Sequence, residues 1–126
     1  MKKMIIITVA VAVLFIGGSI VLLRNTTSDA PTVATIVDGT QVIDITAKGG
    51  YAPRVITASA KMPTTLRVHT KGTFDCSSSL VIPSIGYRGN LPPSGTTDIP
   101  IPAQPSGSTL QGVCGMGMYS FAVRFE

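Results

Sequence analysis

The stretch TLQGVCGMGMYSFAVRF, residues 109–125, contains the patterns that decide the fold of this chain. Its last part alternates strictly, with apolar side chains at positions 119, 121, 123 and 125. Successive side chains of a β-strand point to opposite faces, so this pattern predicts a strand over 118–125 with its odd positions in the core. Residues 109–113 predict a preceding strand. The glycine-rich residues 114–117 are then expected to form the loop between the two strands.

Further short runs of β-branched and apolar residues, bounded by Gly, Pro and Ser, occur through the rest of the chain. They predict strands over 41–47, 54–58, 64–70, 78–83 and 96–101. The last of these contains Pro100, which restricts it to a sheet edge, and 84–94 is expected to be irregular. Seven or so short strands without a helical period indicate an all-β, antiparallel β-sandwich, with the domain spanning 39–126.

Residues 4–23, MIIITVAVAVLFIGGSIVLL, form an apolar run of 20 residues without a charge. As a helix the run extends about 30 Å, the thickness of the hydrocarbon core of a bilayer. Lys2 and Lys3 precede it, which favours a cytoplasmic N-terminus. We expect a single transmembrane helix as an anchor over 1–24, with a cleaved signal peptide as the alternative, and a flexible tether over 25–38. The domain beyond is exported in both cases.

The charge balance and the residue types of the exported part argue against nucleic-acid binding and against catalysis. The chain of 126 residues has a formal charge of +4, but from residue 25 onward it has seven basic and six acidic side chains. This near-neutral balance argues against a nucleic-acid partner, which requires a basic face. The carboxylates are scattered, and no Ser-His-Asp set is apparent, so we expect no enzymatic activity.

The loop of the opening stretch places three sulfur side chains, Cys114, Met116 and Met118, within five residues. Thiolates and thioethers are soft ligands that prefer Cu(I). In an extended strand their spacing would be roughly 6.6 Å per two residues, too far to share an ion, so the loop has to curl. Gly115 and Gly117 permit this curling.

A second sulfur loop is expected at Cys76, 38 residues earlier and also beside a strand. If both loops lie at one end of the sandwich, Cys76 and Cys114 form a metal site with one or both of Met116 and Met118. The alternative is a Cys76–Cys114 disulfide, which is common in exported domains. Both interpretations remain open from the residues alone.

His69 is the only histidine of the chain, and this limits the copper chemistry. A blue-copper electron-transfer centre needs two His and one Cys. His69 also shares the solvent-side parity of Arg67 in the strand 64–70, which argues against a ligand role.

Several blocks of the chain resemble the cupredoxin-like domains of bacterial membrane-associated and metal-transport proteins. They are GYAP at 50–53, MPTTL at 62–66, CSSSLVIP at 76–83, LPPSGT at 91–96 and CGMGMY at 114–119. The resemblance runs from about residue 42 to 125. It implies a Greek-key β-sandwich with a metal-binding end formed by the loops of Cys76 and Cys114.

The chain departs from ordinary cupredoxins in its ligands. The position that resembles Cys76 is a His in that family, and a further His between the Cys and the Met of the last loop is absent here. Loss of imidazole in favour of sulfur favours Cu(I) handling or delivery, with an electron-transfer protein that has an unusual copper centre as a less favoured alternative. The resemblance therefore implies a copper-binding protein, and the apolar run at 4–23 places it in the bacterial cell membrane, single-pass, with its domain on the extracytoplasmic side. Its expected partner is a copper transporter or another copper-handling protein.

Overall fold

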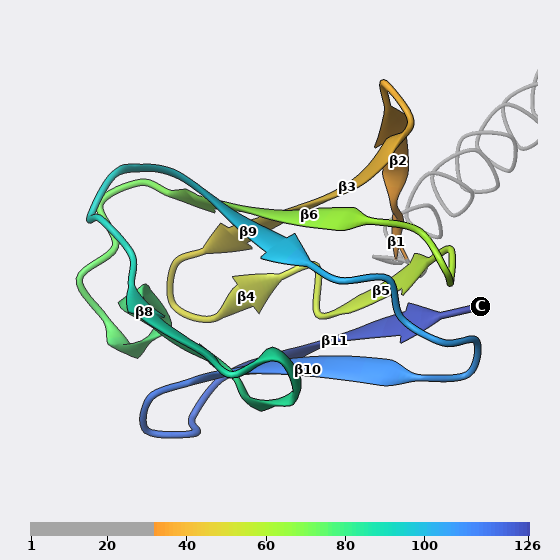
Figure 1. The fold of residues 1–126 in the computed structure, drawn as a ribbon. Coiled ribbons are helices and arrows are strands. Elements are labelled where there is room, and N and C mark those ends of the chain that lie inside the picture. The colour runs from red at the N-terminus through yellow and green to blue at the C-terminus, as the bar shows by residue number, and fades with distance from the viewer. Residues whose placement is uncertain (1–31) are drawn as a thin grey trace, which may run out of the picture. The chain divides into compact units, whose positions relative to one another are not determined.

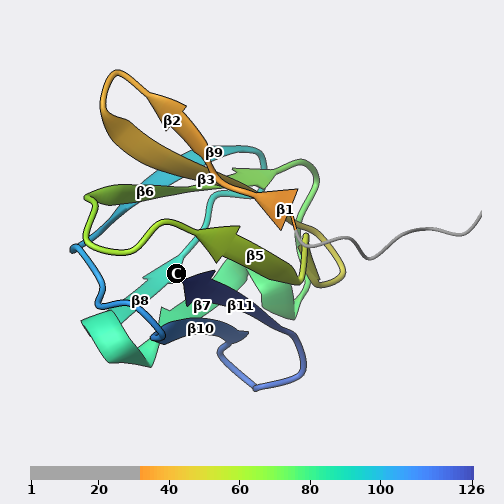
Figure 2. The same cartoon turned by 90° about the vertical axis from the view of Figure 1, so that its right-hand side faces the viewer.

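The structure, a computed structural model, describes residues 32–126, which form two packed β-sheets (Figures 1 and 2). The first sheet has the order β1 (Thr32–Val33), β5 (Val55–Ala58), β11 (Ser120–Phe125), β10 (Thr109–Cys114), β7 (Ser79–Ile82) and β8 (Tyr87–Asn90). The second has the order β2 (Thr35–Val37), β3 (Thr40–Ala47), β6 (Thr64–Thr70) and β9 (Gly95–Ile101), and β4 (Tyr51–Ala52) pairs with β3. Two 3₁₀ turns, η1 (Cys76–Ser78) and η2 (Pro83–Ile85), flank β7.

The core lies between the two sheets and follows the predicted alternation. In β11 the side chains of Phe121, Val123 and Phe125 are almost fully buried, whereas Ser120 and Arg124 are exposed. The buried positions of β6 alternate with half-buried ones in the same way. Burial of apolar side chains on one face of each sheet is the main force that holds the sandwich together. The all-β prediction and the core face of the last strand are therefore confirmed.

The prediction that the sandwich is antiparallel is wrong, because both sheets are mixed. Strand β3 pairs in parallel with β6, and β5 pairs in parallel with both β1 and β11. Between β3 and β6 the chain crosses to the other sheet to form β5, and a connection of this kind returns the next strand in the same direction. Hydrophobic alternation does not distinguish the two orientations, since it reports only which face is buried.

The range 25–38 that was expected to be a tether ends in strands. Residues Thr32–Val33 pair with β5, and Thr35–Val37 pair with β3 across a turn at Asp38 and Gly39. The sheets thus begin before residue 39. All side chains of β1 and β2 are exposed, so no alternation between a buried and an exposed face marks these strands in the sequence. The expected anchor at 1–24 and the first part of the tether lie outside the described residues, and no helix among residues 32–126 has the length and apolar character needed to cross a bilayer.

Two further details concern sheet edges. Strand β9 pairs only with β6 and contains Pro100, as expected for an edge strand. The stretch 84–94, predicted to be irregular, contains β8, which pairs with β7 and forms the edge of the first sheet.

Candidate metal centre

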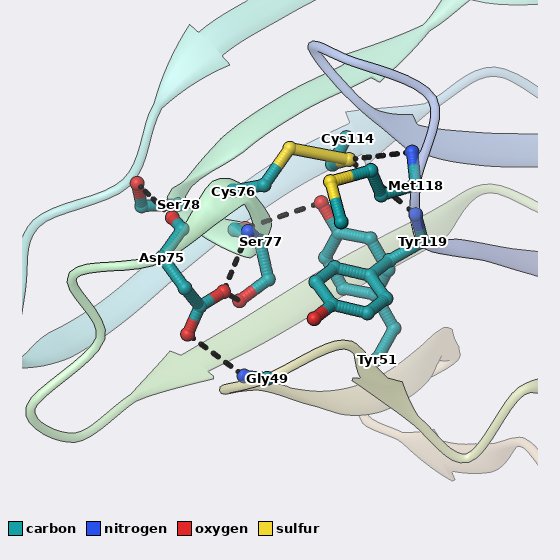
Figure 3. Close-up of a disulfide and its surroundings, with 9 residues drawn as sticks. All are labelled: Gly49, Tyr51, Asp75, Cys76, Ser77, Ser78, Cys114, Met118 and Tyr119. Atoms are coloured by element: carbon teal, nitrogen blue, oxygen red, sulfur yellow. Dashed lines mark hydrogen bonds between the residues drawn. A yellow bond between two sulfur atoms is a disulfide. The ribbon is translucent and has the colours of Figure 1, made fainter.

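The two sulfur loops meet at one end of the sandwich, where β10 ends and η1 begins (Figure 3). Cys76 and Cys114 are joined there as a disulfide, with their Cα atoms 5.8 Å apart. Of the two interpretations that the sequence left open, the structure thus contains the disulfide. The same proximity places two thiols side by side once the bond is reduced.

Cys114 lies in an environment that stabilises a thiolate. Its side chain is 1% exposed, and its Sγ accepts hydrogen bonds from the backbone N–H groups of Met118 (3.1 Å) and Tyr119 (3.4 Å). Donors aimed at a sulfur favour its charged form. In the reduced protein these two amides offset the cost of burying a negative charge.

The loop after Cys114 curls as its glycines predict. Gly117 has a φ of 74°, a left-handed conformation that side chains disfavour, and its N–H donates to the Cys114 carbonyl. The N–H of Gly115 donates to the Ser79 carbonyl at 2.8 Å, which fastens the loop to β7. The tight turn brings the Met118 backbone back against the Cys114 sulfur.

The two methionines differ in their relation to the sulfur pair. Met118 follows the turn, and in Figure 3 its side chain points toward the disulfide although it is 66% exposed. Met116 is 80% exposed and lies at the tip of the loop. The structure therefore brings Cys76, Cys114 and Met118 together, and it leaves Met116 at the surface.

Asp75 holds the Cys76 loop in place. One oxygen of its carboxylate accepts from the Ser77 N–H (2.8 Å) and from the Ser77 hydroxyl, and the other accepts from the Gly49 N–H (2.8 Å). The Ser77 hydroxyl and the two backbone amides hold the pKa of this carboxyl below its usual range. Sequence analysis missed this residue, although an Asp at the start of a helical turn is a recognised capping signal.

Tyr51 also holds the Cys76 loop in place. Its ring packs edge-to-face on Phe121 at 5.2 Å, and its hydroxyl donates to the Ser77 carbonyl at 3.1 Å. Burial, followed by the nearby negative charge of Asp75, raises the pKa of Tyr51 to about 12. The hydroxyl therefore stays protonated and keeps its hydrogen bond at any physiological pH.

His69 does not contribute to the sulfur site. It lies on the outer face of the second sheet, where Nε2 is 2.7 Å from the Asp44 carboxylate and Nδ1 is 3.2 Å from the Thr96 hydroxyl. This agrees with the solvent-side position that the strand alternation predicts. The sulfur pair therefore has no imidazole among its described neighbours.

The donor set fits a soft metal better than a hard one. Within residues 32–126, no three His, Cys, Asp or Glu side chains are arranged to hold an ion. A metal at this end would therefore draw on the sulfurs of Cys76, Cys114 and Met118. Two thiolates and a thioether match Cu(I) in softness and number, and they give little affinity for Mg²⁺ or Ca²⁺.

Comparison with known proteins agrees with this fold. The chain matches the family described as cupredoxin-like domain over residues 8–123. The chain belongs to this family. No curated protein sequence matches it.

Two solved structures resemble this member of the cupredoxin-like family. One is the metal-binding domain of the Streptococcus pneumoniae D39 Cu(I)-exporting P-type ATPase CopA with Cu(I) (TM-score 0.70, 21% identity, 78% of this chain and 97% of that chain). The other is a copper-binding protein in the apo form, determined by NMR in solution (TM-score 0.71, 24% identity, 79% and 100%). At these identities the likeness establishes the fold.

Proposed function

We propose that this protein is a membrane-anchored, extracytoplasmic copper-binding protein that holds Cu(I) through sulfur atoms for handling or delivery. The observation that carries the proposal is the meeting of Cys76 and Cys114 beside Met118 at one end of a cupredoxin-like sandwich. The two solved structures that resemble the fold are described as copper-binding, one of them with Cu(I), which supports copper as the cargo.

The roles of the three residues follow from their surroundings. Cys114 is the buried thiolate, stabilised by two amide N–H groups, and Cys76 is the second, half-buried thiolate. Met118 supplies a neutral thioether on the solvent side, so the total ligand charge stays at two negatives. Only the reduced protein has thiolates, and each thiol releases a proton when it binds the ion.

On this proposal the protein is a binding protein and not an enzyme. The apolar run at 4–23 would fix it in the bacterial cell membrane, and a copper transporter or another copper-handling protein would be its partner. With no imidazole at the sulfur pair, the site would favour Cu(I) over the Cu(II) state that electron transfer also requires.

Competition for Cu(I) between the reduced full-length protein and a chromophoric chelator tests this function. We expect wild type to compete, and Cys76→Ser and Cys114→Ser to lose at least about 100-fold in affinity, since each removes a charged ligand. Met118→Leu should lower the Cu(I) affinity roughly tenfold, and the matched variant Met116→Leu should lower it less than twofold. Equal binding by all variants, or none by wild type, would refute the proposal.

A second candidate is a domain that binds no metal and uses the disulfide as a structural cross-link. The Cys76–Cys114 bond present in the structure favours it. The cheap test is a free-thiol count on protein isolated under anaerobic conditions from copper-fed cells, together with its copper content. Metal-free protein with no free thiol would support the cross-link, and copper bound at two protected thiols would exclude it.

A further inference from the structure

A small pocket shares the residue Met118 with the sulfur site. It has a volume of about 360 Å³ and is lined by residues 48–52, Arg54 and residues 118–120. Figure 3 shows Met118 next to the disulfide, with Tyr119, Tyr51 and Gly49 of this lining below it in the view. We call it the cationic pocket, because its two fully charged side chains are those of Lys48 and Arg54.

Neither cation of the cationic pocket takes part in an ion pair within residues 32–126. The ion pairs among residues 32–126 are Arg67 with Asp98 and His69 with Asp44, on the outer face of the second sheet. Neither Lys48 nor Arg54 takes part in them. The ionised Asp75 carboxylate, which accepts from the Gly49 N–H of the lining and from Ser77, adds one negative charge near the pocket, so the two cations outnumber it. Two unpaired cations in a concave surface attract negative ligands.

The cationic pocket and the sulfur site share a residue. Met118 lines the pocket, and its N–H donates to the Cys114 sulfur at 3.1 Å. A ligand seated in the pocket therefore contacts the residue whose backbone donates to the Cys114 sulfur. The volume is near the lower end of the range for small-molecule sites, and a concave pocket of this size suits a small ligand better than a protein surface.

We propose that the cationic pocket binds the carboxylates of a small thiol that carries Cu(I), so that copper arrives as an anionic thiolate complex. This rests on the proposed Cu(I)-binding function. In the transfer, a bond between Cu(I) and the carrier sulfur breaks, and a bond between Cu(I) and Cys76 or Cys114 forms. The proton of the protein thiol passes to the released carrier thiolate, and copper remains Cu(I) throughout.

Loading of the reduced full-length protein from two matched donors tests the proposal. Glutathione is the probe with free carboxylates, and its diethyl ester carries the same thiol without them. Each is charged with Cu(I), and thiols still unprotected after a set time are alkylated and counted by mass spectrometry. We expect wild type to load about 5–10 times faster from glutathione than from the ester, as electrostatic attraction predicts.

Two double variants with the same net charge locate the effect. Lys48→Gln/Arg54→Gln should load from both donors at the slower rate, whereas Lys61→Gln/Arg124→Gln, which changes cations outside the pocket, should keep the glutathione advantage. Equal rates from both donors in wild type, or an undiminished advantage in the pocket variant, would overturn the proposal.

A copper-free measurement separates this inference from the function on which it rests. S-methylglutathione keeps the carboxylates but has no free thiol. NMR titration of the full-length protein should give saturable shifts at the amides of Gly49, Gly50 and Ser120 in wild type, and these shifts should be lost in Lys48→Gln/Arg54→Gln. Absence of shifts in wild type would overturn the proposal that the cationic pocket binds carboxylates. Shifts without any Cu(I) loading would refute the copper function and leave the anion site standing.

Discussion

The two loops that carry the cysteines differ in how they are held. In the Cys76 loop, Thr73 and Ser77 are almost fully buried, and the Thr73 hydroxyl, the Asp75 carboxylate and the Tyr51 hydroxyl each make a hydrogen bond to another segment or across the turn. In the loop after Cys114, residues 115–118 are all exposed, and they are held by hydrogen bonds of their backbone N–H groups to carbonyls and to the Cys114 sulfur.

This difference indicates that the two loops have different roles at the sulfur site. Side chains buried under the Cys76 loop fix one sulfur, so that little ordering is required when a metal binds. The exposed loop keeps its methionine accessible to solvent and to a donor. Apart from the ligand Cys76 itself, variants that affect the first loop should therefore act mainly on stability, and variants in the second mainly on Cu(I) binding.

Reduction of the disulfide should have the largest effect, because that bond joins the two loops. A cross-link between residues 38 apart is expected to contribute about 3–4 kcal/mol to the free energy of unfolding. Urea unfolding with and without reductant measures it. Adding Cu(I) to the reduced protein should restore stability through binding to the folded state. The Cys76→Ser/Cys114→Ser variant is the control, and sensitivity of that variant to the reductant would contradict the assignment.

The substitution Tyr51→Phe tests the rigid loop. It removes the donor to the buried Ser77 carbonyl and should lower the free energy of unfolding by about 1–2 kcal/mol. Its Cu(I) affinity should change less than threefold. The control is Tyr87→Phe. Tyr87 is half-buried, and its hydroxyl has no hydrogen bond among the described residues. Equal destabilisation by both would show that the hydrogen bond to Ser77 makes no specific contribution to the stability of the loop.

The substitution Gly117→Ala tests the exposed loop. With a φ of 74° and open space around a new Cβ, the cost is backbone strain alone, about 1 kcal/mol. The larger effect should be on copper, with a severalfold loss of Cu(I) affinity as the turn moves Met118 away from Cys114. Gly107→Ala, at a φ of 83° and also in open space, imposes the same strain far from the sulfurs. A similar copper defect in Gly107→Ala would break the comparison.

The smallest expected effect is the pH dependence contributed by Asp75. Because its pKa is lowered in the folded protein, its contribution to stability is fully present above the unfolded pKa of about 4 and is lost as pH falls through the folded value. The stability difference between wild type and Asp75→Asn should therefore shrink from pH 6 to pH 3. A difference that stays constant over this range would assign the effect to neutral hydrogen bonding at the Ser77 and Gly49 donors.

Local sequence patterns predicted much of the site, because strand alternation and loop glycines depend only on residues that are adjacent in the chain. The alternation at 119–125 set the core face of β11, and the glycines at 115 and 117 allowed the turn that the structure shows. The exclusion of His69 followed from the parity of one strand. The Asp75 contacts and the cationic pocket were missed, since they join segments such as 48–54 and 118–120 that nothing in the chain order connects.

The sequence by itself determined the β class, the buried faces of the long strands and the sulfur character of the site, because alternation and ligand softness depend only on residue type and spacing. Tertiary structure alone decided the mixed strand directions, the entry of residues 32–37 into the sheets and the meeting of Cys76 with Cys114. These depend on which segments the packing of two sheets brings side by side. The pattern of residues along the chain does not specify which segments become neighbours.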